Sequence, residues 1–270
     1  MALTEKDLLA KVPTGLYING KWVSGHGEKQ ISVEDPATGK SLLEIANATA
    51  EDALAALTAA DEAQAKWGRT PARERAEILR RTFDLVRERA EEFAMLISLE
   101  MGKPLAEARG EVTYGNEFLR WFSEEAVRVT GRYNSNPEGT GKILIAKRPV
   151  GPAFAITPWN FPLAIFTGQV AAALAAGNAV LAKPAEQTPL IAALGVELLL
   201  KAGVPASALQ FLPGDGAVVG LGEAVVVGDS AGEGGGGVDH VVLLAAPCVA
   251  SVEEQYVTRV TVGSRRSEEH

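Results

Sequence analysis

The sequence predicts an α/β fold in which a parallel sheet is covered by helices, and three observations support this. After Gly151, short apolar runs alternate with helical segments, and strands joined by helices of this length form right-handed crossovers and a parallel sheet. Before that point, apolar residues recur every three or four positions, which predicts long packed helices. A 47% apolar and 22% charged composition over 270 residues provides the core that such a fold needs.

The first elements are short strands. Residues 16–23 place strand-forming residues on both sides of Asn19 and Gly20, the dipeptide that favours a tight hairpin turn. A further strand is expected at residues 30–33, and residues 35–39 have the composition of a turn. This part of the chain is therefore expected to be a β-ribbon that leads into helices.

Three helices are expected next. Thr49 is suited to cap the first, with acidic residues in its first turn, and Pro71 is suited to the first position of the second. The second is expected to be continuous past residue 90, and the third to run from Leu105 to Gly131. The periodic positions of the second helix are Leu79, Phe83, Val86, Ala90, Phe93 and Ile97.

A different pattern connects these helices to the parallel sheet. Residues 134–141 are rich in Asn, Pro and Gly and are expected to form a loop. Residues 142–148 predict a strand with charges at both ends, of the kind that lies at a sheet edge or is donated to a neighbouring chain.

The predicted parallel unit has strands at residues 153–157, 178–182 and 209–212, joined by helices at 162–176 and 188–202, the latter amphipathic. Ligands bind at the carboxyl ends of such strands. Asn160 follows the first strand, and Lys183 and Glu186 follow the second, a pairing that suits the two hydroxyls of a ribose. Singly these are weak signals, and no G-x-G-x-x-G or Walker loop is present.

Composition limits the partners and the location. A formal net charge of −8 argues against a nucleic-acid partner held through its phosphates. The single cysteine, Cys248, excludes an internal disulfide framework and fits a reducing compartment. The sequence has no basic and apolar leader and no run of membrane-spanning length. We therefore expect a cytoplasmic protein with no nucleic-acid or membrane partner and no metal.

Several spaced motifs agree in order with one known family. They are residues 18–22, Glu100-Met101-Gly102-Lys103-Pro104, Ile156-Thr157-Pro158-Trp159-Asn160-Phe161-Pro162, and residues 172–177, 183–189, 202–205 and 213–216. Through these motifs, residues 15–220 resemble the aldehyde dehydrogenase superfamily, over about the first half of a family member. The resemblance implies a Rossmann-like, NAD-binding fold, here truncated, with residues 132–150 as a loop and an oligomerisation-type strand.

The resemblance also implies residue roles. Asn160 matches the donor to the oxyanion of a covalent thiohemiacetal intermediate. Lys183 matches a residue that binds the adenosine ribose, and Glu186 matches a carboxylate that accepts the ribose hydroxyls and repels a 2′-phosphate, which favours NAD over NADP. The remaining residues implied in the cofactor site are Ile156, Thr157, Trp159, Gly214 and Gly220.

The substrate expectation combines two resemblances. Residues 15–160 are most similar to succinate-semialdehyde dehydrogenases, whereas residues 158–220 are more similar to pyrroline-5-carboxylate dehydrogenase, and Gly168 stands where the former usually have Arg. We expect succinate semialdehyde as the substrate of the intact enzyme, with glutamate semialdehyde, the substrate of the latter, as the alternative. Family members are typically homodimers or homotetramers.

Residues 221–270 do not continue the family pattern. This glycine-rich segment contains neither the family's general-base motif nor its nucleophile motif. We therefore expect that it is a frame-shifted or mis-predicted translation joined to a truncated gene. We therefore expect that the catalytic domain is absent and that the chain is inactive. The alternatives are a non-catalytic nucleotide-binding remnant and a poorly folding fragment with an unprotected sheet edge. The tail residues weighed and rejected for catalysis or metal binding are Glu223, Glu233, His240, Cys248 and His270.

Overall fold

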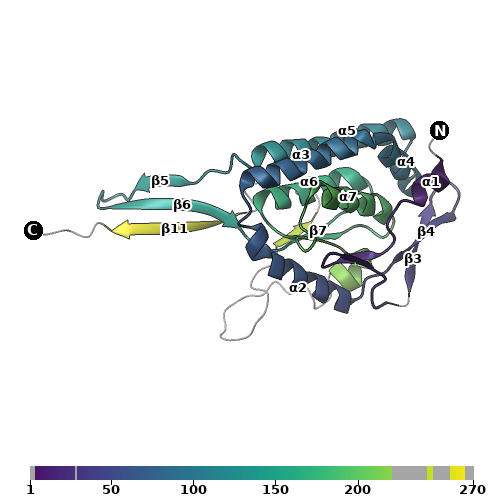
Figure 1. Cartoon of the computed structure of the whole chain (residues 1–270), viewed down its shortest axis with the longest axis horizontal. Helices are drawn as coiled ribbons and strands as arrows, with labels where there is room; N and C mark the ends of the chain where they lie inside the picture. Colours follow the sequence, from purple (N-terminus) through teal and green to yellow (C-terminus); the bar gives the residue numbers. More distant parts are fainter. Residues whose placement is uncertain (1–3, 28, 221–241, 246–255, 265–270) are drawn as a thin grey trace, which may run out of the picture.

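A six-stranded sheet lies at the centre of the protein, with the strand order β10-β7-β8-β9-β1-β2. The structure, a computed structural model, describes residues 4–27, 29–220, 242–245 and 256–264 (Figure 1). The strands β7, β8 and β9 run parallel, as predicted, β10 also runs parallel to β7, and β1 joins the sheet antiparallel to β9. The strands are β1 (Leu16–Ile18), β2 (Lys21–Val23), β7 (Ala153–Ile156), β8 (Val180–Lys183), β9 (Leu209–Phe211) and β10 (Val242–Ala245).

The strand β10 comes from the segment after residue 220 and pairs along β7 from Val242 to Ala245. One hypothesis from the sequence was a poorly folding fragment whose parallel sheet lacks its later strands and so has an unprotected edge. In the described sheet, β10 occupies the position beside β7 and is itself the end strand.

Helices cover both faces of the sheet (Figure 1). Alternate residues of β7 and β8 point to opposite faces, so Phe154 and Leu181 belong to one apolar cluster and Ala155 and Val180 to the other. The first cluster includes α2, and the second includes α6 and α7, on whose outer side α3, α4 and α5 pack. The helices are α2 (Ala50–Trp67), α3 (Ala72–Glu88), α4 (Ala90–Met101), α5 (Leu105–Glu125), α6 (Pro162–Ala176) and α7 (Pro189–Ala202).

The helix α7 differs from the amphipathic helix that the sequence predicted. It is buried on almost every side, with Glu197, Leu200 and Lys201 as its less buried positions. The reason is its place between the sheet and the outer helices α3 and α4. Close packing also marks the contact of α5 with α6, where a Cβ at Gly115 would lie 2.9 Å from the Cα of Ala164.

Two helix boundaries also differ from the prediction. The helix expected to be continuous past residue 90 is two helices, because Arg89 leaves the helical region with φ −108° and ψ 19°. The apolar stripe continues through Val86 and Phe93 on both sides of this break, so periodicity does not detect it. The next helix ends at Glu125 rather than near Gly131, although Ala126 remains buried.

The predicted N-terminal ribbon is confirmed. Asn19 and Gly20 form the turn between β1 and β2 with φ values of 45° and 83°. The strand β3 (Gln30–Asp35) pairs antiparallel with β4 (Lys40–Ala46), which the sequence did not predict. Two further short elements are α1 (Glu5–Leu9) and the π-helix η1 (Gly216–Gly220).

A second sheet projects from the body of the molecule (Figure 1). Its order is β11-β6-β5, with β5 (Arg132–Ser135), β6 (Gly141–Pro149) and β11 (Tyr256–Ser264). The strand β6 was expected either at a sheet edge or donated to a neighbouring chain. Within the described sheet it is the middle strand, because β11 pairs with it over its whole length. The strand β5 also takes part of the segment expected as a loop.

No helix within the described ranges is long and apolar enough to cross a membrane.

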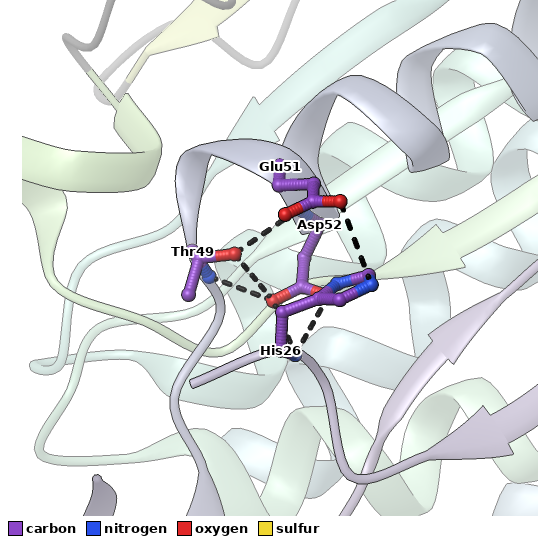
Figure 2. Close-up of polar contacts among 4 residues, drawn as sticks. All are labelled: His26, Thr49, Glu51 and Asp52. Carbon is purple, nitrogen blue, oxygen red and sulfur yellow. Dashed lines mark hydrogen bonds and ion pairs between the residues drawn. The ribbon is translucent and has the colours of Figure 1, made fainter. Parts of the chain in front are cut away.

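The start of α2 is held by the cap that the sequence predicted, together with a histidine (Figure 2). Thr49 and Asp52 form a reciprocal capping box, and the Asp52 carboxylate also accepts hydrogen bonds from the backbone N–H of His26, with Nδ1 of the ring 2.7 Å from Oδ1. The hydrogen bond to Asp52, followed by the negative charges of Glu51 and Asp52, raises the pKa of His26. A protonated His26 therefore stabilises this helix start.

We predict that His26→Gln makes stability less dependent on pH. Because the pKa of His26 is raised in the folded state, its contribution is complete below the unfolded value of about 6.5 and is lost as pH rises through the folded value. The difference in melting temperature between wild type and variant should be larger at about pH 5 than at about pH 8. A melting-temperature difference that is the same at both pH values would contradict the prediction. The variant Glu51→Gln, which removes one of the charges that raise the pKa of His26, should show part of the same loss of pH dependence.

Candidate functional site

The carboxyl ends of β7, β8 and β9 meet at one edge of the central sheet, and the turns that follow them carry most of the predicted site. Ile156 at the end of β7 is in register with Lys183 at the end of β8. One residue further, the backbone N–H of Thr157 donates to the carbonyl oxygen of Lys183 at 3.0 Å. The first two turns of the site are therefore joined directly through their backbones.

A lysine and a glutamate link the second turn to the third. Lys183 is 3% exposed, and its Nζ donates to the carbonyl of Pro184 at 2.9 Å and to Oε1 of Glu186 at 3.1 Å. The same Oε1 accepts the backbone N–H of Gly216 at 2.7 Å. Burial alone would raise the pKa of Glu186, but the hydrogen bonds and the charge of Lys183 outweigh it and lower the pKa. Glu186 is thus an anchored, ionised carboxylate.

A surface hollow opens beside this carboxylate. Asn47 and Glu186 both line it, and Oδ1 of Asn47 accepts the backbone N–H of Asp215 at 3.3 Å. The hollow presents two carboxylates, Glu186 and Asp215, which can accept hydrogen bonds from the hydroxyls of a sugar. Its lining residues are Ile31, Asn47, Glu186, Gln187, Asp215, Gly216 and Ala217.

The two predicted glycines lie in and after the third turn. A Cβ at Gly214 would come within 2.7 Å of Val219 and 3.2 Å of Ala48, so this glycine allows the turn to pack against the segment before α2. A backbone hydrogen bond of 2.9 Å from Ala48 to the carbonyl of Pro213 fixes the same contact. Gly220 is the last residue of η1.

Asn160 and Trp159 occupy an exposed turn at the start of α6. Trp159 is 53% exposed, and Phe161 beside Asn160 is 43% exposed. The backbone carbonyl of Asn160 accepts Nζ of Lys103 at 3.2 Å, whereas its side-chain amide makes no hydrogen bond with any residue that the structure describes. The amide is therefore available to donate to a ligand at this surface.

Two buried glutamates hold the helices that follow these turns, and sequence reasoning missed them. Glu111 Oε1 accepts the backbone N–H groups of Leu163 (3.0 Å) and Ala164 (3.3 Å) at the start of α6. Glu100 likewise accepts those of Leu190 (2.8 Å) and Ile191 (2.9 Å) at the start of α7. The available signal was an acidic residue on the apolar stripe of a helix, one turn from Ile97 in α4 and from Ala108 in α5.

Comparison with known proteins gives the family of this chain. The model of the aldehyde dehydrogenase family matches residues 22–226. The chain belongs to the aldehyde dehydrogenase family. The resemblance predicted from the motifs is thereby confirmed, and the described sheet and its helices are the nucleotide-binding part of that fold.

Individual relatives of this aldehyde dehydrogenase chain agree with that assignment. Succinate-semialdehyde dehydrogenase of Paenarthrobacter nicotinovorans is 60% identical over 169 residues, which are 63% of this chain and 38% of that protein. The NADP(+) succinate-semialdehyde dehydrogenase GabD of Escherichia coli (strain K12) is 41% identical over 203 residues, or 75% of this chain and 42% of that protein.

Among solved structures, succinate-semialdehyde dehydrogenase from Burkholderia pseudomallei matches with a TM-score of 0.77 and 40% identity. The match covers 80% of this chain and 45% of that one. The chain therefore spans about two fifths of the length of the relatives it matches.

The structure brings some of the predicted site residues together and leaves others apart. Ile156, Thr157, Lys183 and Glu186 lie on adjoining turns, whereas Asn160 stands at the start of α6 and makes no hydrogen bond with them. Within the described ranges, no group of three or more His, Cys, Asp or Glu side chains could hold a metal ion. The tail residues Glu223, Glu233, His240, Cys248 and His270 lie outside the described residues.

The pKa of the buried acid Glu100 is strongly perturbed. Burial raises the pKa of its carboxyl to about 8, and the nearby charge of Glu111 adds to this, although the N–H groups of Ile191 and Leu190 oppose it. Glu111 has the cation of Lys103 beside it, whereas no cation among the residues that the structure describes is paired with Glu100. The folded protein therefore retains a proton on Glu100 at a pH at which the unfolded chain has lost it.

We predict that Glu100→Gln flattens the pH dependence of stability. Because the folded pKa of about 8 lies above the unfolded value of 4.5, the contribution of Glu100 is complete below the unfolded value and is lost as pH rises through the folded one. In thermal unfolding, wild type should lose stability relative to the variant between about pH 5 and about pH 8.

The control for this experiment is Glu91→Gln, on the exposed side of α4. The pKa of Glu91 is lowered, chiefly by its hydrogen bond with Arg109, so its contribution is lost only as pH falls to acid values. That variant should show no change over the same interval. A pH-independent difference between wild type and Glu100→Gln would show that Glu100 is not protonated in the folded protein.

Proposed function

We propose that this chain forms the dinucleotide-binding part of an enzyme that oxidises succinate semialdehyde to succinate, with NAD as the hydride acceptor. The observation that carries the proposal is the Lys183, Glu186 and Gly216 network at the carboxyl edge of a parallel sheet, the location where such folds bind nucleotides. The similarity to succinate-semialdehyde dehydrogenases supports the choice of aldehyde.

The residues present fit the adenosine end of a dinucleotide. The side chain of Glu186 is 36% exposed and borders the hollow, so its carboxylate can accept hydrogen bonds from ribose hydroxyls. The buried ammonium group of Lys183 balances its negative charge. Ile156 and Thr157 contribute backbone beside this turn, and Trp159 an exposed ring on the next. When bound, the nicotinamide would accept a hydride from the substrate.

Charge supports NAD rather than NADP. A 2′-phosphate in the hollow would face two carboxylates, Glu186 and Asp215, and like charges at short range repel. The name of the Escherichia coli relative includes NADP(+), so both cofactors belong in the test.

On the aldehyde side, the exposed amide of Asn160 is suited to donate a hydrogen bond to an oxygen on which negative charge develops. The net reaction converts the aldehyde, water and the oxidised cofactor into the carboxylic acid, the reduced cofactor and a proton. Gly168 on α6 stands where the resemblance to succinate-semialdehyde dehydrogenases would place an Arg, so glutamate semialdehyde is kept as the alternative substrate.

We predict that Glu186→Ala weakens NAD⁺ binding, measured by calorimetry, by about tenfold or more, since a hydrogen bond to a charged group contributes about 1.5–3 kcal/mol. Glu186→Gln should in addition reduce the preference for NAD⁺ over NADP⁺, because it removes the charge that repels the 2′-phosphate. Glu117→Gln is the matched control, since Glu117 pairs with Arg120 three residues away on the exposed side of α5. No NAD⁺ binding by wild type would overturn the proposal.

We predict that the chain by itself shows no aldehyde-dependent formation of NADH. The described residues contain no cysteine, and loss of a covalent nucleophile removes several orders of magnitude of rate. The measurement is absorbance of the reduced cofactor with succinate semialdehyde or glutamate semialdehyde as substrate. Turnover that is abolished by alkylation of Cys248 would contradict this prediction and identify that residue as the nucleophile.

A further inference from the structure

Lys103 lies in the short segment between α4 and α5, yet its side chain is only 8% exposed. Its ammonium group has three neighbours. Nζ is 2.5 Å from Oε2 of Glu111 and 3.2 Å from the carbonyl oxygen of Asn160, and it lies 4.1 Å from the centroid of the Phe161 ring. Since an ammonium has three N–H donors, these contacts account for all of them.

The partner of Lys103 holds the other side of the same turn. Glu111 uses Oε2 for Lys103 and Oε1 for the N–H groups of Leu163 and Ala164. The helix α6 begins at Pro162 and has no side-chain cap from its own N-cap residue, Phe161, so Glu111 provides the acceptor that the helix start lacks. One ion pair therefore fixes the backbone on both sides of the Phe161-Pro162 step.

Stability alone is a weak reason for such a pair. Removing two charges from water costs several kcal/mol per ion in proteins, and apolar replacements of buried pairs are often neutral or stabilising. The pair does, however, direct one donor to the backbone of Asn160, whose side chain remains free for a ligand. The hydrogen bond from Lys103 therefore acts on the position of Asn160.

We propose that Lys103 is a positioning residue for Asn160: with Glu111, it holds the backbone of the turn so that the Asn160 amide keeps one orientation toward the reacting oxygen. This inference rests on the proposed function, in which Asn160 donates to that oxygen. The binding of NAD⁺ at Glu186 does not depend on it.

The experiment follows the side-chain amide of Asn160 by NMR in the full chain labelled with ¹⁵N-asparagine. Asn160→Ser assigns its signal, and the buried Asn116 and Asn178 serve as internal references. Lys103→Met removes the cation but leaves Glu111 buried without it, which can prevent folding. The double variant Lys103→Met/Glu111→Gln removes both charges and keeps the fold testable.

In wild type we expect one sharp pair of Asn160 amide signals. In the double variant this pair should shift and broaden or split, while the signals of Asn116 and Asn178 remain in place. The matched control is Glu91→Gln/Arg109→Met, which removes an exposed ion pair between α4 and α5 and should leave the Asn160 signals unchanged.

An unchanged Asn160 signal in a folded double variant would overturn the proposal and leave the pair with a structural role only. A change of equal size at Asn116 and Asn178 would overturn it too, because the effect would then be global. The NAD⁺ titration of wild type reports on the proposed function separately, so its failure is distinguishable from the failure of this inference.

Discussion

The starts of two buried helices impose the constraint on which the rest of the site depends. The first N–H groups of a helix have no partner within the helix, and the first residues of α6 and α7 are buried, so water does not supply one. Both begin with a proline and lack a side-chain cap of their own. Glu111 and Glu100, which come from the outer helices, provide the missing acceptors. The turns that carry Asn160 and Glu186 are therefore held from outside the sheet.

Burying a carboxylate at each helix start is electrostatically unfavourable, and the surroundings of the two glutamates compensate for this in different ways. Glu111 is paired with Lys103, so its negative charge is balanced inside the protein. Glu100 has no such cation in the described part of the chain, and its burial favours the protonated form. The outer helices therefore do more than bury the core. They supply the glutamates that hold the two functional turns, and the surroundings of each glutamate determine whether it is ionised or protonated.

Sequence predicted the features that depend on neighbouring residues and missed those that depend on distant ones. Thr49 and the Asn19-Gly20 turn were predicted because cap and turn chemistry act within a few residues. The motif order also identified the family and the parallel sheet. The acceptors at the helix starts could not be predicted in the same way, because Glu111 lies 52 residues from Leu163 and Glu100 lies 90 residues from Leu190.

Other differences have the same origin. The break at Arg89 affects the backbone of one residue and leaves the apolar stripe intact on both sides. The strand β6 has the charged ends of an edge strand, but its central place depends on β11, more than a hundred residues later. Asn47 is joined to the site by its hydrogen bond with Asp215, which is 168 residues away in the sequence.

The confinement of α6 also limits how this helix can change during evolution. Its start is fixed by Glu111, and Gly177 ends it in the left-handed region with φ 88°. Between these two points every residue is buried except Ile165, which is partly exposed. A mutation elsewhere on the helix must preserve volume against a packed neighbour, whereas a mutation at Ile165 need not. Among the residues of α6, Ile165 is therefore the position at which sequence divergence is best tolerated.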